Sequence, residues 1–159
     1  MAKQIIITVH NQLDVSLDAR PENNWFDSGG VKGGDSYMPN ISPLETKTIT
    51  LIPVTGSGIG VSGYVVYSAD LSSAGYYVAI AASNPIMGSN KLDIAIYKYS
   101  DDLYSEAHNL WENMSNHNYA YFDHSFDIGI PDKKIYTRCL CTGGDTNSCD
   151  ILLAYEEPS

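Results

Sequence analysis

The feature that most constrains the fold is the stretch of residues 55–97, in which apolar and aromatic runs of strand length alternate with short polar segments. β-Branched and aromatic residues favour strands, whereas Asn, Asp, Gly, Ser and Pro favour turns. Residues 64–67, 76–82 and 92–97 therefore predict three consecutive strands, joined by turns at residues 70–75 and 84–90. Because loops at the end of a sheet often carry function, the Ser83-Asn84-Pro85 corner is a candidate binding site.

Runs of the same kind continue along the chain. They predict further strands at residues 4–9, 14–18, 25–27, 46–53, 119–126, 134–141 and 149–156. About ten short strands with this punctuation favour two packed antiparallel sheets. Residues 101–113 begin with acidic side chains and space their apolar residues along one helical face. We therefore expect a mostly β protein, an antiparallel β-sandwich with one short flanking α-helix, in a single domain over residues 1–159.

The charge balance excludes some partners. The chain has 9 Lys and Arg against 19 Asp and Glu, a formal net charge of -10. Such a surface repels phosphate backbones, so we expect no nucleic-acid partner. The sequence contains no apolar run of about 18 residues or more, and its N-terminus lacks a signal-peptide pattern. We expect a soluble protein with no signal peptide or transmembrane helix.

The sequence gives little support for catalysis. The four histidines are scattered, and no Gly-Xaa-Ser-Xaa-Gly elbow is present. We expect no enzyme activity and no cofactor.

Three cysteines cluster near the C-terminus, at Cys139, Cys141 and Cys149. Hairpin-like spacing allows a disulfide bond between Cys141 and Cys149 in an oxidising compartment, which leaves one thiol over. Two cysteines two residues apart on a strand, with no histidine nearby, make a poor tetrahedral zinc site. We therefore expect no metal.

Tyrosine is unusually frequent, with 12 copies against 2 Trp and 3 Phe. An apolar ring with a polar tip suits both sugar-binding clefts and membrane interfaces. Cross-strand tyrosine pairs in an ordinary sheet would give the same pattern.

The order of several short motifs resembles the actinoporins over nearly the whole chain. These motifs are the first strand with His10-Asn11, Trp25-Phe26-Asp27-Ser28-Gly29, the Gly-rich residues 58–63, Ser83-Asn84-Pro85, the helix with Tyr104, and a final Gly-containing hairpin. Residues 84–91 are also similar to a loop of the aegerolysin-type insecticidal proteins, and fungal fruit-body lectins are similar in architecture.

The resemblance implies a membrane-binding sandwich with a cleft for a choline-type lipid head group. The residues carried over to this cleft are Ser28, Val61, Ser83, Pro85, Tyr104 and His108. Serine hydroxyls donate to phosphate oxygens, and tyrosine faces attract a quaternary ammonium. We expect Ile86, Met87 and Trp111 to make the first membrane contact. The alternative is that Ser28 and Ser83 only cap turns.

Two functions follow as expectations. The first is a cytolytic or insecticidal toxin, or toxin component, that binds a lipid or glycolipid head group outside the producing cell. It would permeabilise target membranes as a homo-oligomer or with a second toxin component. The second is a carbohydrate-binding lectin of the same architecture that forms no pore. The acidic surface favours a neutral glycan or a zwitterionic lipid over an anionic one.

Overall fold

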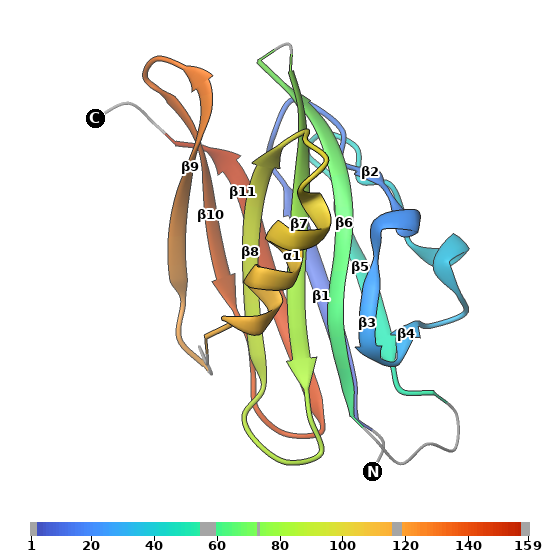
Figure 1. Ribbon diagram of the computed structural model, residues 1–159. Helices are drawn as coiled ribbons and strands as arrows, with labels where there is room; N and C mark the ends of the chain where they lie inside the picture. Colours follow the sequence, from blue (N-terminus) through green and yellow to red (C-terminus); the bar gives the residue numbers. More distant parts are fainter. Residues whose placement is uncertain (1–2, 55–59, 73, 116–118, 157–159) are drawn as a thin grey trace.

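The computed structural model describes residues 3–54, 60–72, 74–115 and 119–156, which form two facing sheets (Figure 1). The first sheet has the order β4 (Gly30–Val31), β5 (Thr46–Ile52), β1 (Gln4–Asn11), β11 (Thr146–Tyr155), β10 (Lys133–Leu140) and β9 (Phe122–Ile130). In the second sheet, β2 (Asp18–Ala19) and β3 (Trp25–Ser28) both pair with β6 (Val61–Leu71), which is followed by β7 (Ala74–Asn84) and β8 (Lys91–Lys98). The predicted β-sandwich is confirmed.

The helix α1 (Leu103–Glu112) lies across the outer face of β6, β7 and β8 (Figure 1), and two short 3-10 helices, η1 (Pro21–Asn23) and η2 (Asp35–Tyr37), flank the strands. None of the helices among the described residues has the length and apolar character needed to cross a bilayer.

Three details differ from the sequence prediction. Strands β1 and β11 pair in parallel, whereas the other strand pairs of the described residues are antiparallel. Residues 14–16 do not form a strand, because the chain there crosses from one sheet to the other; Leu17 forms an isolated bridge with Ile41, and the strand β2 begins only at Asp18. The strand expected from residue 119 begins at Phe122.

The core lies between the sheets, where period-2 alternation places the apolar side chains of each strand. Ile5, Ile7 and Val9 of β1 are fully buried there. Strand β6 is buried on both faces because α1 covers its outer side. Small Ala79 and Ala81 on β7 allow α1 to pack closely.

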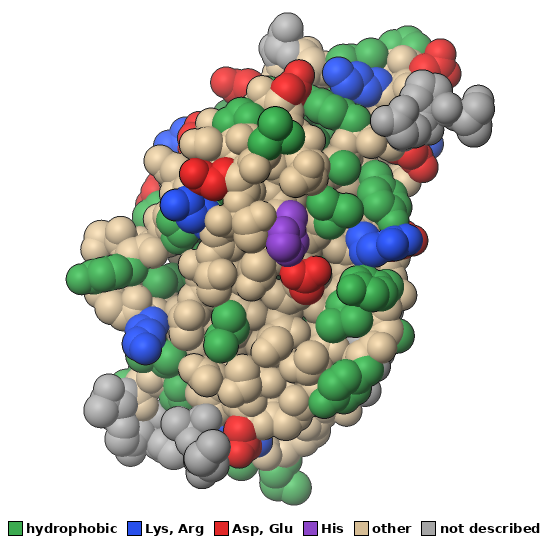
Figure 2. Space-filling model, turned by 180° about the vertical axis from the view of Figure 1, so that it is seen from behind, with side chains coloured by type: hydrophobic (Ala, Val, Ile, Leu, Met, Phe, Trp, Pro, Cys, Tyr) green, Lys and Arg blue, Asp and Glu red, His purple; other side chains and the backbone are tan. Residues whose placement is uncertain are grey.

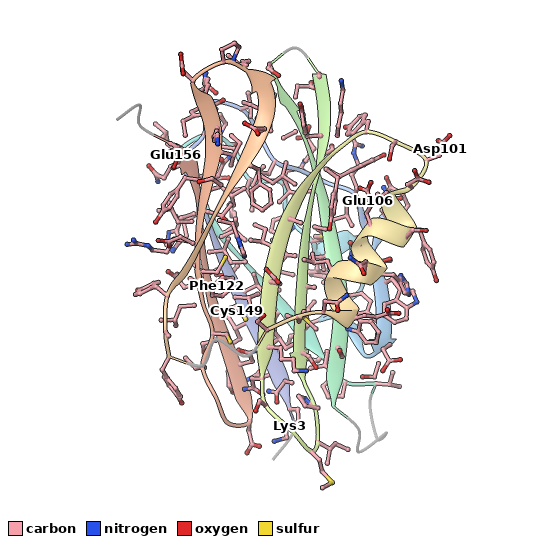
Figure 3. All side chains as sticks on the ribbon, turned by 60° about the vertical axis from the view of Figure 1, so that its left-hand side comes forward. Lys3, Asp101, Glu106, Phe122, Cys149 and Glu156 are labelled. Atoms are coloured by element: carbon pink, nitrogen blue, oxygen red, sulfur yellow. The ribbon has the colours of Figure 1, made fainter. Side chains whose placement is uncertain are left out.

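Three buried asparagines join the two sheets at one end of the sandwich. Asn84 Nδ2 donates to the backbone oxygens of Gln4 (2.9 Å) and Asp145 (2.8 Å). Asn90 Nδ2 bonds the carbonyl oxygens of residues 142 and 144, and Asn147 Nδ2 bonds those of residues 83 and 91. These bonds fix the β7–β8 loop at the end of the sandwich where Lys3 lies (Figure 3). The Ser83-Asn84-Pro85 corner is therefore partly a structural clamp.

All three cysteines are buried, and Cys149 lies between the sheets (Figure 3). The sulfur atoms of Cys139 and Cys149 are unbridged thiols, so the Cys141–Cys149 disulfide that the spacing allows is not formed in this structure. Burial raises the pKa of both thiols well above its ordinary value. Formation of a disulfide requires that a thiol ionises and that an oxidant reaches it. Burial disfavours the ionisation of these thiols and also shields them from an oxidant.

Candidate functional site

Helix α1 brings its aromatic side chains against two strands. The His108 ring lies 4.2 Å, centroid to centroid, from Trp25 of β3 and also 4.2 Å from Tyr104. The rings of Trp25 and Trp111 meet edge to face at 4.8 Å. Tyr64 Oη lies 3.1 Å from His108 Nδ1. Burial, and then the nearby Tyr104, raise the pKa of Tyr64 from 10.0 to about 12, so this phenol keeps its proton at a pH where an exposed tyrosine ionises.

A row of polar residues crosses the sheet next to this aromatic cluster. Ser28 of β3 pairs with Ser62 of β6, Ser62 pairs with Ser83 of β7, and Ser83 pairs with Lys91 of β8. Trp111 Nε1 donates to Ser62 Oγ at 2.8 Å, which shows that Ser62 faces α1. In-register partners in an antiparallel sheet share a face, so Ser83 and Lys91 also face this side.

The row and the end of α1 enclose a hollow of about 290 Å³. Its walls are Ser62, Ser83, Lys91, Trp111, Glu112 and Met114. We name it the Trp111 hollow. It combines hydroxyl groups and an ammonium group, which bind phosphate oxygens, with an indole ring and a carboxylate, which bind a quaternary ammonium.

An apolar loop lies at the same end of the sandwich. Ile86 and Met87, in the connection from β7 to β8, are 53% and 86% exposed. The same loop begins with the half-buried Pro85 and ends with the clamped Asn90. Exposed apolar side chains on a fixed loop are suited to contact with a membrane surface.

A second hollow, of about 380 Å³, lies at the N-terminal end of α1. Its lining residues are Glu22, Asn23, Asn24, Trp25, Tyr64, Tyr77, Ser100, Asp101, Leu103 and Tyr104. We name it the Tyr104 hollow. Figure 3 shows Asp101 at the opposite end of the molecule from Lys3, so this hollow lies farther from the β7–β8 loop than the Trp111 hollow. Aromatic faces next to carboxylates and amides are a setting in which sugars or organic cations bind.

The structure brings together some of the predicted site residues and separates others. Tyr104, His108 and Trp111 share α1, and Ser83 lines the Trp111 hollow. Val61 is 0% exposed in the core, so its side chain lines no open cleft. Ser28 Oγ donates to the Gly60 carbonyl at 2.9 Å, which commits its hydrogen atom to the backbone.

Sequence reasoning missed four residues of the Trp111 hollow: Ser62, Lys91, Glu112 and Met114. Ser62 alternates with Tyr64, so its face was readable once Tyr64 was assigned to the α1 side. Glu112 and Met114 gave no such signal, because their position depends on where α1 packs.

No protein-family model and no curated protein sequence matches the chain. Among solved structures, the crystal structure of the lipid-binding protein Nakanori matches with a TM-score of 0.73, over 97% of this chain and 72% of that chain, at 11% identity. The chain has the fold of this lipid-binding protein. The expectation of a β-sandwich with one short flanking helix, of the kind seen in this lipid-binding protein, is thus confirmed at the level of the fold.

Weaker matches cover similar shares of the chain. The lectin XCL of Xerocomus chrysenteron is 13% identical, over 97% of this chain and all 100% of its own, with a TM-score of 0.48. IP-1A from Alcaligenes faecalis is 14% identical over 99% of this chain and 94% of its own, with a TM-score of 0.44.

Proposed function

We propose that this protein binds the zwitterionic head group of a membrane lipid in the Trp111 hollow. The observation that carries the proposal is the position of Lys91 and Glu112 on the walls of one hollow that also contains the Trp111 ring. Lys91 and the Ser83 hydroxyl match a lipid phosphate, while the Trp111 face and Glu112 match a quaternary ammonium. The fold shared with a lipid-binding protein supports this proposal.

Membrane attachment adds a second contact. The β7–β8 loop with the exposed Ile86 and Met87 lies between Ser83 and Lys91 of the hollow, so a head group in the hollow and a bilayer surface against the loop are compatible. We extend the proposal to permeabilisation of the bound membrane, by assembly of several copies or together with a partner protein.

Co-sedimentation with vesicles tests the lipid proposal. Vesicles of phosphatidylcholine with sphingomyelin are expected to pellet the protein, and vesicles of phosphatidylglycerol are expected to pellet much less of a chain with net charge -10. Lys91→Met should weaken binding to the zwitterionic vesicles, whereas Lys98→Met, at the far end of the same strand, should not. Met87→Ser should weaken it more than Leu44→Ser, which removes a side chain that is 73% exposed elsewhere. Equal binding by Lys91→Met and Lys98→Met would contradict the proposed site.

Dye release from the same vesicles tests permeabilisation separately. Release of an entrapped dye by bound protein supports a pore-forming or toxin function. Binding without release limits the function to membrane recognition, or makes it dependent on a partner.

The second candidate function is that of a lectin that forms no pore. The Tyr104 hollow favours it, because it places Glu22 and Asp101 beside the rings of Trp25 and Tyr104. Carboxylates accept hydrogen bonds from sugar hydroxyls while an aromatic face covers the apolar side of a sugar ring. Binding to glycan-coated beads that is lost in Tyr104→Ala and kept in Lys91→Met would favour this candidate over the first.

A further inference from the structure

The outer face of the six-stranded sheet carries a hollow that the lipid proposal does not use. It has a volume of about 350 Å³ and is lined by His10, Gln12, Tyr121, Arg138, Asp150 and Leu152. Because α1 packs on the other sheet, this hollow lies on the opposite side of the sandwich, on the face seen in Figure 2. We name it the Arg138 hollow.

The lining residues lie in register across neighbouring strands. His10 of β1 pairs with Leu152 of β11, Leu152 pairs with Arg138 of β10, and Arg138 pairs with Asp123 of β9. Their sequence neighbours Val9 and Ile151 are fully buried, so alternation directs this row to solvent. The sheet itself therefore sets the spacing of these groups.

The polar groups of the hollow are already held in place. His10 Nε2 lies 2.8 Å from Asp150 Oδ1, and His10 Nδ1 lies 3.0 Å from Thr46 Oγ1. Arg138 Nε donates to Asp123 Oδ1 at 3.1 Å, and Arg138 Nη2 lies 3.5 Å from Asp123 Oδ2. Histidine and acidic side chains are adjacent on this face (Figure 2). Groups fixed before binding lose little conformational entropy when a ligand arrives.

The charges of the hollow point to a neutral ligand. Although the chain carries a net charge of -10, here Asp123 is paired with Arg138, and Asp150 is hydrogen-bonded to His10. Both partners of the Asp123–Arg138 pair remain about half exposed. Acceptor and donor groups are thus available, and the two lining side chains that carry a full charge, Arg138 and Asp150, are of opposite sign.

The apolar part of the hollow suits a ring with one apolar face. The Tyr121 side chain is 62% exposed and lies 5.5 Å, measured from its ring centroid, from Arg138 Cζ. Leu152 provides an aliphatic patch between the polar groups.

We propose that the Arg138 hollow binds a neutral pyranose unit of a glycan, with the sugar ring against Tyr121 and its hydroxyl groups on Asp150, Arg138 and Gln12. A volume of about 350 Å³ lies near the lower end of ligand sites and suits a single sugar ring.

This site is independent of the proposed lipid function. A lipid bound beside α1 and a glycan bound on the opposite sheet do not compete for space. The protein would then bind a membrane with one face and a glycan with the other.

The test is an NMR titration of the isotopically labelled full chain with five separate sugars: galactose, glucose, mannose, N-acetylglucosamine and N-acetylgalactosamine. At least one sugar is expected to shift the backbone amide signals of residues 10, 138 and 150. Tyr121→Ala and Asp150→Asn should each weaken that binding about tenfold or more. Tyr37→Ala, which removes a tyrosine side chain that is 71% exposed elsewhere, is the matched control and should bind as the unsubstituted protein does.

Three results would overturn the inference. They are no shift at these amides with any of the five sugars, shifts confined to residues that line the Tyr104 hollow, or binding unchanged in both Tyr121→Ala and Asp150→Asn. Vesicle co-sedimentation of the same two variants should stay unchanged, so a failure here is distinguishable from a failure of the lipid proposal.

Discussion

Trp111 Nε1 donates a 2.8 Å hydrogen bond to Ser62 Oγ. This bond joins the C-terminal turn of α1 to β6, a strand with neighbours on both sides in the second sheet. The bond orients the indole that forms one wall of the Trp111 hollow. It is also the contact that links the aromatic cluster of α1 to the row of serines across β3, β6 and β7.

Ser62→Ala should lower the free energy of unfolding by about 1 kcal/mol, because the half-buried indole N–H loses its acceptor. Urea unfolding followed by tryptophan fluorescence measures this change. Ser105→Ala, an exposed substitution on α1, is the control and should change stability by less than about 0.5 kcal/mol. Equal stability of the two variants would show that the Trp111–Ser62 bond contributes nothing measurable.

Asn84→Ala should destabilise the protein by about 2–4 kcal/mol, because it removes a fully buried side chain that donates two hydrogen bonds, to the carbonyls of Gln4 and Asp145. Chemical unfolding of this variant and of Asn109→Ala, which changes an exposed asparagine of α1, gives the comparison. If Asn84→Ala unfolds at the same denaturant concentration as Asn109→Ala, the asparagine clamp between the sheets does not hold them together.

Arg138→Met should raise the pKa of the Asp123 carboxyl towards its ordinary value, because the hydrogen bond and charge of Arg138 lower that pKa. A depressed folded-state pKa contributes stability above the unfolded-state pKa, and this contribution is lost as the pH falls through the folded-state value. An NMR titration of the side-chain carboxyl carbons measures the pKa of Asp123 in the unsubstituted protein and in Arg138→Met. The pKa of Asp145, which the separate ion pair with Lys3 lowers, is the internal control and should not move.

Alkaline unfolding should begin above pH of about 10, because burial raises the pKa values of Tyr64 and Tyr97 from 10.0 to about 12. Stability that depends on these neutral phenols is complete below the unfolded-state pKa and is lost as the pH rises through the folded-state pKa. In one pH titration, the absorbance of tyrosinate near 295 nm measures tyrosine ionisation, and far-ultraviolet circular dichroism measures the loss of β structure. Complete tyrosine ionisation below pH 11 with the β signal intact would contradict the burial of these phenols.

The strands were largely readable from the sequence. Residues 64–67, 76–82 and 92–97 were expected as strands, and each lies inside a longer observed strand. The runs extend farther in the structure because β6 and β7 pair over their whole length, which adds polar residues such as Ser62 and Ser83 to the ladder. The strand propensity of single residues does not predict that these serines belong to strands, since their pairing depends on the neighbouring strand.

The candidate sites were readable only in part. Tyr104 and His108 were named because the resemblance to the actinoporins carries them over, and Trp111 because helical spacing places it on the apolar face of the helix. The role of Asn84, Asn90 and Asn147 in joining the sheets, and the Arg138 hollow, were not found. Their partners are far apart in the chain, as in the contact between His10 and Asp150, which are separated by 140 residues.

The sequence by itself determined that this chain forms strands with one face apolar, one short amphipathic helix and an acidic surface, because these depend on residue type and local periodicity. The tertiary structure alone decided which faces meet. It paired β1 with β11 in parallel, buried Val61, and placed Lys91 and Glu112 around one hollow. The physical reason is that register and packing depend on contacts between distant segments, and the local pattern does not encode them.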